Sequence, residues 1–139
     1  MIGERTAEEI KIKTGSAWPL NEELTIEVRG RDLITGLPKF VKVTSEEIRE
    51  ALQVAIKEIV DAAKVTLERT PPELAADVMD KGMVMSGGSS LLRNLDQLIS
   101  KTIGVPCYLA DEPLLCVVKG TGMALENLDL YKRTMMMTK

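Results

Sequence analysis

The sequence predicts an α/β fold in which helices and short strands form one lobe. Three observations favour this class: apolar and polar side chains alternate over 24–29, apolar residues recur every three or four positions over 45–69, and strand and helix patterns alternate in the C-terminal half. A length of 139 residues with 45% apolar side chains suffices for a single domain with a core. We therefore expect one lobe and no second domain.

A helix and a β-hairpin are predicted for the N-terminal part of the chain. Thr6 and Glu9 have the spacing of a capping box, which indicates a helix over about 7–13. The alternation at 24–29 is typical of a half-buried strand, and 40–43 can pair back with it after a turn. These two strands predict a small β subdomain.

A long helix is predicted over 45–69, where Thr44 and Glu47 form a second capping box and the apolar positions share one face. Those positions are Ile48, Leu52, Ala55, Ile56, Ile59 and Ala63. At 1.5 Å per residue such a helix spans roughly 37 Å, so we expect it to lie along the core. Thr70 and Glu73 have the spacing of a third capping box, which opens a short helix.

Strand and helix patterns then alternate. Gly82 is suited to end the short helix, and the apolar residues 83–85 predict a buried strand. Ser89 or Ser90 caps the next helix, which ends at Gly104.

The last part of the chain predicts a second short strand over 107–109 and a helix opened by Asp111. Gly120 and Gly122 weaken that helix, so we expect a close approach of backbone or ligand there. Two parallel strands make a thin sheet, and we interpret this as a sign that further strands belong to a longer protein.

Composition excludes several classes of function. A net charge of −3 without a basic stripe argues against a nucleic-acid partner. The absence of histidine excludes Ser-His and Cys-His nucleophile pairs. Cys107 and Cys116 lack the spacing of a metal site and are interpreted as reduced core thiols. No export signal or long apolar stretch is present, so we expect a cytoplasmic protein.

Two patterns are candidates for a binding site. The apolar strand that passes through Gly87 and Gly88 into a helix favours an anion or nucleotide, because first-turn amides are unpaired and the helix dipole places about half a positive charge there. A tight turn alone explains the glycines equally well. Glu8 and Lys11 share a helix face that suits a ribose and a base, although a solvated ion pair is the commoner explanation.

Five separated segments closely resemble the MreB family of bacterial actin homologues. They are GERTAEEIK (3–11), VRGRDLITGLPK (28–39), EALQ (50–53), TPPELAADVMDKGMVMSGGSSLLRNLD (70–96) and EPLLCVVKGTGMALEN (112–127). The resemblance implies that 1–139 is part of the second lobe of an actin-like, ribonuclease H-like ATPase fold. It also implies a small β subdomain at about 13–44, a larger α/β subdomain formed by 1–12 and 45–132, and a tail at 133–139.

The resemblance implies a nucleotide held between two lobes, with adenine and ribose against the second. The implied nucleotide-binding residues are Glu8, Glu9, Lys11, Gly87, Gly88, Ser89, Ser90 and Leu91, with the register of Glu8 against Glu9 left open. Ser89 replaces a glycine that is common in the family, which puts the loop conformation in question because serine disfavours positive φ. No catalytic or metal-binding residue is implied in this chain. The phosphate loops and the acidic group that arranges Mg²⁺ precede it in the family, so we expect no ATP hydrolysis by this chain alone.

The function implied is that of an ATP-binding, filament-forming cytoskeletal protein that maintains rod cell shape in a bacterium. Its implied partners are further copies in a head-to-tail filament and the cell-wall synthesis machinery at the membrane, with cytoplasmic filaments associated with that membrane. The alternative is the nucleotide-binding lobe of another actin-superfamily ATPase, such as a sugar kinase or heat-shock chaperone. A helical adaptor without a ligand is the third possibility.

Overall fold

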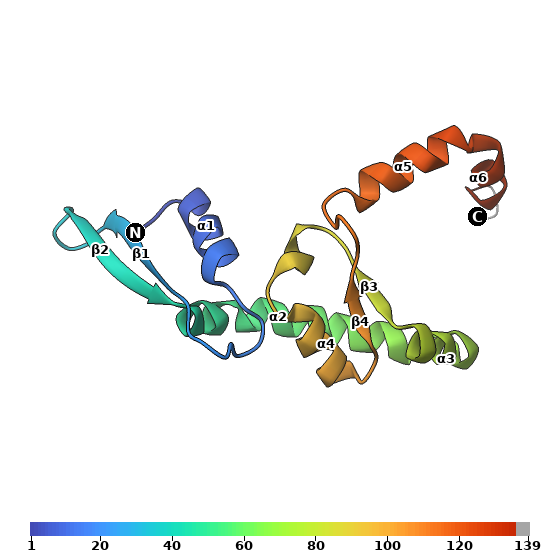
Figure 1. Cartoon of the computed structure of the whole chain (residues 1–139), viewed down its shortest axis with the longest axis horizontal. Coiled ribbons are helices and arrows are strands. Elements are labelled where there is room, and N and C mark those ends of the chain that lie inside the picture. The colour runs from blue at the N-terminus through green and yellow to red at the C-terminus, as the bar shows by residue number, and fades with distance from the viewer. Residues whose placement is uncertain (136–139) are drawn as a thin grey trace.

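Helix α2 (Ser45–Glu68) runs along the molecule, and most other elements are arranged around it (Figure 1). The structure is a computed structural model that describes residues 1–135. The predicted capping box at the start of α2 is confirmed: the Glu47 amide donates to Thr44 Oγ1 at 3.2 Å, and the Thr44 amide donates to Glu47 Oε2 at 2.9 Å. Ile56 and Val60 are buried, whereas Ile59 is 46% exposed, so the predicted face was partly wrong.

Helix α1 (Glu4–Thr14) begins three residues before the predicted start. The capping box at Thr6 and Glu9 is wrong, because Gly3 is the residue before the helix and its carbonyl already accepts the Ala7 amide at 3.0 Å. Thr6 therefore lies within the first turns of the helix. An acidic Glu4 in the first turn favours the earlier start, since it faces the positive end of the helix dipole.

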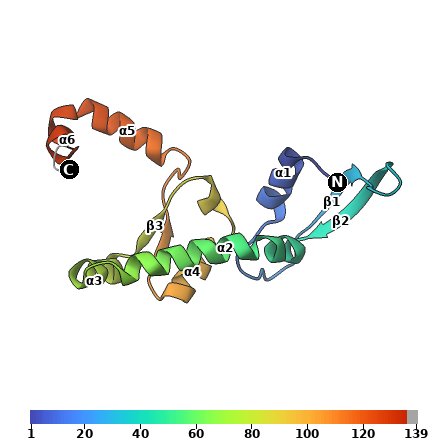
Figure 2. The same cartoon turned by 180° about the vertical axis from the view of Figure 1, so that it is seen from behind.

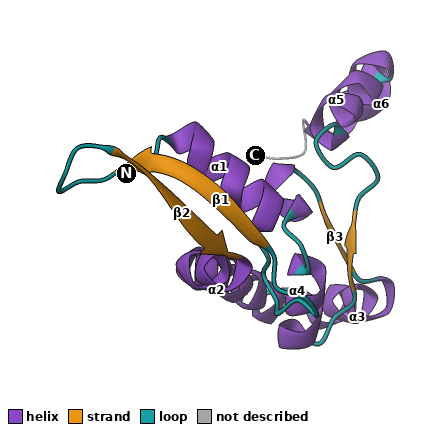
Figure 3. Cartoon of the chain, turned by 60° about the vertical axis from the view of Figure 1, so that its left-hand side comes forward, coloured by secondary structure: helices purple, strands orange, loops and turns teal. Residues whose placement is uncertain are grey.

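Strands β1 (Thr25–Arg31) and β2 (Pro38–Thr44) form the predicted antiparallel hairpin, with Val28 opposite Val41. Figure 3 shows this curved ribbon beside α1, with β2 leading directly into α2. At its tip Asp32 accepts hydrogen bonds from the amides of Ile34 and Thr35, which lower the pKa of its carboxyl. The hairpin is longer than predicted because pairing continues to the residues that flank the turn.

Helix α3 (Pro72–Lys81) follows α2 after a short turn, without its predicted capping box. The Thr70 hydroxyl donates back to the Thr66 carbonyl at 2.8 Å instead of capping α3, and Pro71 precedes the helix. Gly82 ends α3 as predicted, with φ at +83°. A Cβ at Gly82 would lie 2.6 Å from the Tyr108 ring, so both conformation and space require glycine there.

Strands β3 (Met83–Met85) and β4 (Cys107–Leu109) form the predicted parallel pair. The prediction that β3 is buried was wrong: Val84 is 69% exposed, because only one face of this two-stranded sheet is packed. Cys107 packs against the core from the edge of that face, and burial raises the pKa of its thiol. Cys107 and Cys116 are free cysteines, as predicted, but both are half-buried.

The helix expected directly after the glycines begins later. Gly88–Leu91 form a short 3₁₀ helix, η1, and α4 (Leu95–Ile103) starts after Asn94, which has a left-handed conformation. The prediction that Ser89 or Ser90 caps this helix is therefore wrong, because Asn94 is the residue before α4. Gly104 ends α4 as predicted.

Helix α5 (Cys116–Glu126) begins five residues after Asp111, because Glu112 adopts a positive φ of 46° that is incompatible with a helix. A Cβ at Gly120 or Gly122 would meet nothing within 4 Å, so no close approach explains these glycines within the described chain. Helix α6 (Leu128–Met135), which was not predicted, follows α5 and extends into the predicted tail. Residues 136–139 of that tail lie outside the described residues.

The core lies between α2, α4 and the strand pair. Its buried residues are Ala17, Ile56, Val60, Leu95 and Ile99. Helices α5 and α6 project away from this core in two opposite views (Figures 1 and 2). None of the helices in the described part of the chain is long and apolar enough to cross a membrane.

The two Thr-x-x-Glu pairs at the ends of α2 allow a matched test of capping. Thr44→Ala is expected to reduce the free energy of unfolding by about 1 kcal/mol, because it removes a cap that satisfies a backbone amide. Thr70→Ala is the control, since its hydroxyl satisfies no backbone amide and donates only to an exposed carbonyl in the last turn of α2. Urea denaturation of both variants checks this, and equal losses would contradict it.

Glu23 predicts an acid-dependent change in stability. Its Oε1 accepts from Ser45 Oγ at 2.7 Å and from the Glu46 amide at 2.6 Å, which lowers its pKa below the ordinary value of 4.5. The stabilisation is present above that value and is lost as the pH falls through the lower pKa of the folded state. Glu23→Gln should therefore lower the melting temperature at pH 7 and leave it unchanged at the acid end. A pH-independent difference would exclude this role of the carboxylate.

Candidate functional site

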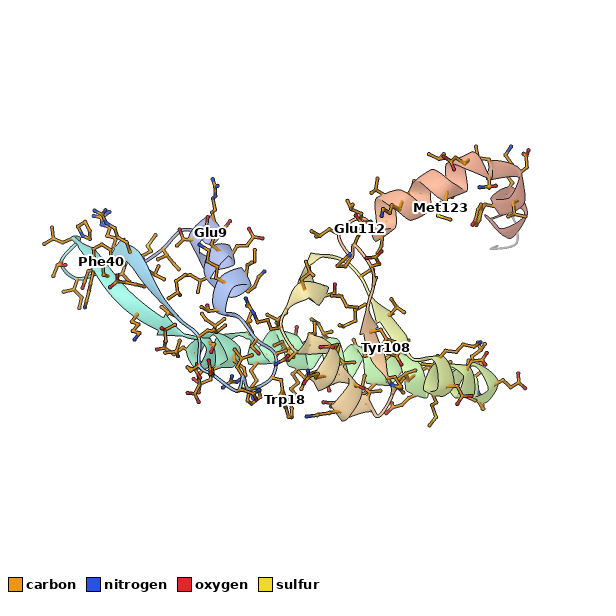
Figure 4. All side chains as sticks on the ribbon, in the orientation of Figure 1. Glu9, Trp18, Phe40, Tyr108, Glu112 and Met123 are labelled. Carbon is orange, nitrogen blue, oxygen red and sulfur yellow. The ribbon has the colours of Figure 1, made fainter. Side chains whose placement is uncertain are left out.

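Helix α1 presents the first group of predicted site residues on its surface. Glu8, Glu9 and Lys11 are all exposed, and Figure 4 shows Glu9 and Trp18 on opposite sides of α2. Glu9 forms an ion pair with Arg5 at 3.6 Å, one turn earlier on the helix. Among the described residues Glu8 and Lys11 form no ion pair with each other, so the solvated pair that is the commoner explanation of their spacing is not present.

The diglycine loop that contains the second group has a defined conformation. Gly87 has a φ of +85° and a ψ of 170°, and a Cβ there would meet no atom of the described residues within 4 Å, its chain neighbours aside. Glycine is therefore required by the backbone conformation and not by lack of space. The loop is closed by Ser90, whose Oγ donates to the Gly87 carbonyl at 2.5 Å and whose side chain is buried.

The donors at this loop differ from those of a long helix N-terminus. The Gly87 amide is already used, since it donates to the Pro113 carbonyl at 2.8 Å. The amides of Gly88 and Ser89 open η1 and find no acceptor among the described residues. Because η1 has only four residues, the helix dipole that we expected at this point is largely absent.

Ser89 and Leu91 complete this group. Ser89 does not have a positive φ. Within the described chain, Asn94 and Glu112 are the residues other than glycine that have this conformation. The loop conformation therefore does not require a glycine at position 89, where the family commonly has one. The Leu91 side chain is 49% exposed.

A junction between distant residues fixes α1 relative to this loop. The Arg93 guanidinium donates to the carbonyls of Ile12 at 2.9 Å and Gly15 at 3.3 Å, at the C-terminal end of α1. Arg93 also pairs with Ser16 in an isolated parallel bridge, and its carbonyl accepts the Ala17 amide at 2.8 Å. The junction therefore connects the end of α1, which carries the first group of predicted site residues, with the residue that follows shortly after the diglycine loop, which carries the second group.

Sequence reasoning did not identify Arg93 or Ser16 as important residues. Ser16 is completely buried, and its hydroxyl donates to the carbonyl of Trp18. The contacts of Arg93 with Ser16 and Gly15 join residues 77 and 78 positions apart, so no local period or motif signals them. A serine in a polar segment and an arginine before a helix are compatible with ordinary surface positions.

Two hollows occur elsewhere on the molecule. One of about 610 Å³ is lined by Trp18 and one face of α2, and one of about 470 Å³ lies between Ile10 of α1 and the hairpin. Neither is lined by the predicted site residues. Within the described chain no cluster of three or more His, Cys, Asp or Glu side chains could hold a metal ion.

Comparison with known proteins supports one family. Residues 1–133 match the model of the MreB/Mbl protein family. The chain is 50% identical to the cell shape-determining protein Mbl of Bacillus cereus over 136 residues, which are 97% of this chain and 41% of Mbl. It is also 50% identical to the cell shape-determining protein MreB of Escherichia coli K12 over 131 residues, 94% of this chain and 38% of that protein.

Solved structures agree with this result. The crystal structure of MreB5 of Spiroplasma citri bound to ADP matches with a TM-score of 0.87 and 39% identity, over 91% of this chain and 39% of MreB5. The AMPPNP-bound form of the same protein matches with a TM-score of 0.87 and 38% identity, over 96% of this chain and 40% of that structure. The chain thus spans about two fifths of the relatives that it matches. Its mixed α/β architecture is part of an actin-like fold, and the chain belongs to the MreB/Mbl family.

Proposed function

We propose that this chain is the C-terminal part, from the middle of the second lobe onward, of an ATP-binding bacterial cytoskeletal protein that forms filaments and maintains rod cell shape. Family membership supports the proposal, since the relatives are named cell shape-determining proteins. It favours this function over that of a sugar kinase, a heat-shock chaperone or an adaptor without a ligand. Within the chain, we assign 13–44 to a small β subdomain and 1–12 with 45–132 to a larger one.

The single observation that carries the nucleotide assignment is the Arg93 junction. It holds α1 and the diglycine loop in one fixed arrangement, which a ligand shared by both would require. Relatives of known structure bind ADP and AMPPNP. We assign Glu8, Glu9 and Lys11 to the ribose and base, and the loop from Gly87 to Leu91 to the other side of the nucleoside.

The residues present fit a nucleoside. The amides of Gly88 and Ser89 have no acceptor among the described residues, and nothing occupies the space beside Gly87, so a ligand can approach the backbone there. The Glu8 carboxylate can accept from ribose hydroxyls, and the Lys11 stem can lie along the base. When bound, ATP would supply the phosphoanhydride bond that the intact protein hydrolyses. Its triphosphate and Mg²⁺ would be held by groups outside these 139 residues.

We also propose head-to-tail self-association. The hairpin carries exposed apolar side chains at and near its tip, namely Leu33, Ile34, Leu37 and Phe40. Arg29 lies over the Phe40 ring at 5.8 Å, so charge and apolar surface occur together on this subdomain. A heterologous contact of this kind produces an open filament when the rotation between subunits does not close. Such cytoplasmic filaments would organise the cell-wall synthesis machinery at the membrane.

Nucleotide binding is tested on this chain by amide resonances in NMR during titration with ADP. The Gly88 and Ser89 resonances should shift. Glu8→Ala should weaken binding about tenfold, which corresponds to about 1.4 kcal/mol for one hydrogen bond to a charged group. Glu68→Ala, at the far end of α2, is the control and should have no effect. The nucleotide assignment fails if ADP shifts neither resonance.

Filament assembly is tested by sedimentation of the intact subunit. Replacing Arg29 and Arg31 together by Glu should reduce the pelleted fraction severalfold, because it reverses the charge of the proposed contact surface. A matched reversal of two exposed lysines on other elements, Lys57 and Lys101, controls for net charge. Unchanged pelleting of the hairpin variant alongside the control would remove the hairpin from the interface.

A further inference from the structure

The segment that leads from β4 to α5 lies against the diglycine loop. The Gly87 amide donates to the Pro113 carbonyl at 2.8 Å. Earlier in both segments, the Ala110 amide donates to the Met85 carbonyl at 2.9 Å. A Cβ placed on Gly88 would lie 3.3 Å from Leu114 Cδ2. Two groups of this segment, one polar and one apolar, therefore face successive glycines of the loop.

The two glycines differ in what a side chain would meet at each position. Gly87 has a φ of +85° and open space beside it, so any other residue is strained there whatever its surroundings. Gly88 does not have a positive φ, and among the described residues other than its chain neighbours only the Leu114 side chain comes within 4 Å of a Cβ built there. At Gly88 the Leu114 side chain thus lies close to the space that a larger residue's Cβ would occupy.

The turn that presents these groups is itself constrained. Glu112 has a φ of 46°, which is rare for a residue with a side chain, and the Leu115 amide donates to the Glu112 carbonyl at 2.8 Å. Lys119 forms an ion pair with the Glu112 carboxylate one turn into α5. Figure 4 shows Glu112 at the base of α5. This conformation directs the Pro113 carbonyl and the Leu114 side chain toward the loop.

Core packing does not account for Leu114. Its side chain is 66% exposed, and it is absent from the buried cluster. An exposed leucine at a constrained turn contributes little to the stability of the fold, yet its end lies beside the position that a side chain at Gly88 would occupy. Its effect is expected on the loop and not on global unfolding.

We propose that the turn at 112–115 positions the diglycine loop for nucleotide binding, with Leu114 as the positioning residue and Gly88 as its counterpart. This inference rests on the proposed nucleotide-binding function. Leu114 acts through the loop: it keeps the Gly88 and Ser89 amides in the place where a ligand would meet them. Pro113 supports the same arrangement through its carbonyl.

The first test measures amide hydrogen exchange of the loop in the free chain. Leu114→Ala should accelerate exchange at Gly87 about fivefold or more, whereas Leu114→Met should restore it and the melting temperature should stay within the range of wild type. Equal exchange at Gly87 in wild type and Leu114→Ala would overturn the proposal. A fall in melting temperature that accounts for the faster exchange would also overturn it, because the role would then be structural.

A second test uses the difference between the glycines. Gly88→Ala should accelerate Gly87 exchange in wild type and should have less effect when Leu114 is already Ala, since the shortened side chain leaves room for the new Cβ. Gly87→Ala should change the amide exchange of the loop equally in wild type and in Leu114→Ala, because the strain that it causes comes from the positive φ and not from a contact with Leu114. Additive effects of Gly88→Ala and Leu114→Ala would contradict a direct fit.

The ligand experiment separates this inference from the function on which it rests. In the ADP titration followed by amide resonances, Leu114→Ala should raise the dissociation constant about fivefold or more, and Leu114→Met should restore it. Binding of ADP to wild type and to Leu114→Ala with equal affinity overturns the positioning role and leaves the proposed function intact. Failure of wild type to bind ADP overturns the proposed function, and the role of Leu114 in nucleotide binding with it.

Discussion

The arrangement of the candidate site depends on one junction, between Arg93 and the residues that follow α1. The Arg93 guanidinium satisfies the free carbonyls of Ile12 and Gly15, and its backbone pairs with Ser16 and Ala17. The last carbonyls of a helix have no partner within the helix, so the Arg93 Nη1 group, which donates to both carbonyls, caps the end of α1 and holds it in position. The fully buried Ser16 completes the polar contacts.

Beyond that junction, the chain buries little of its apolar surface. Helix α5 packs mainly with α6, and Val117 is 76% exposed. The outer face of β3 is likewise uncovered, in a sheet of only two strands. Apolar surface on this scale usually marks contacts with other parts of a protein or with partners. It agrees with the proposal that these residues form about two fifths of a larger, self-associating subunit.

Local patterns predicted the elements better than their ends. Three Thr-x-x-Glu sequences were interpreted as capping boxes, and only the one at Thr44 is formed. At Thr6 the helix had already begun, and at Thr70 the hydroxyl donates back into α2. The same four residues are compatible with several backbone conformations. The path of the backbone before the motif determines which of these conformations forms, and the four residues of the motif do not specify that path.

The sequence by itself determined the order of the longer helices and the strands as far as α5, the hairpin, the parallel strand pair and, through five resembling segments, the family. These depend on periodicity, on glycine and proline, and on contacts between near neighbours. Only the tertiary structure decided that Leu114 lies beside the space for a side chain at Gly88, that the loop forms η1 and not the start of α4, and that Arg93 holds α1. Each of these results from groups that folding brings together from distant positions, or from a turn whose conformation its neighbours impose. Such contacts leave no period in the sequence.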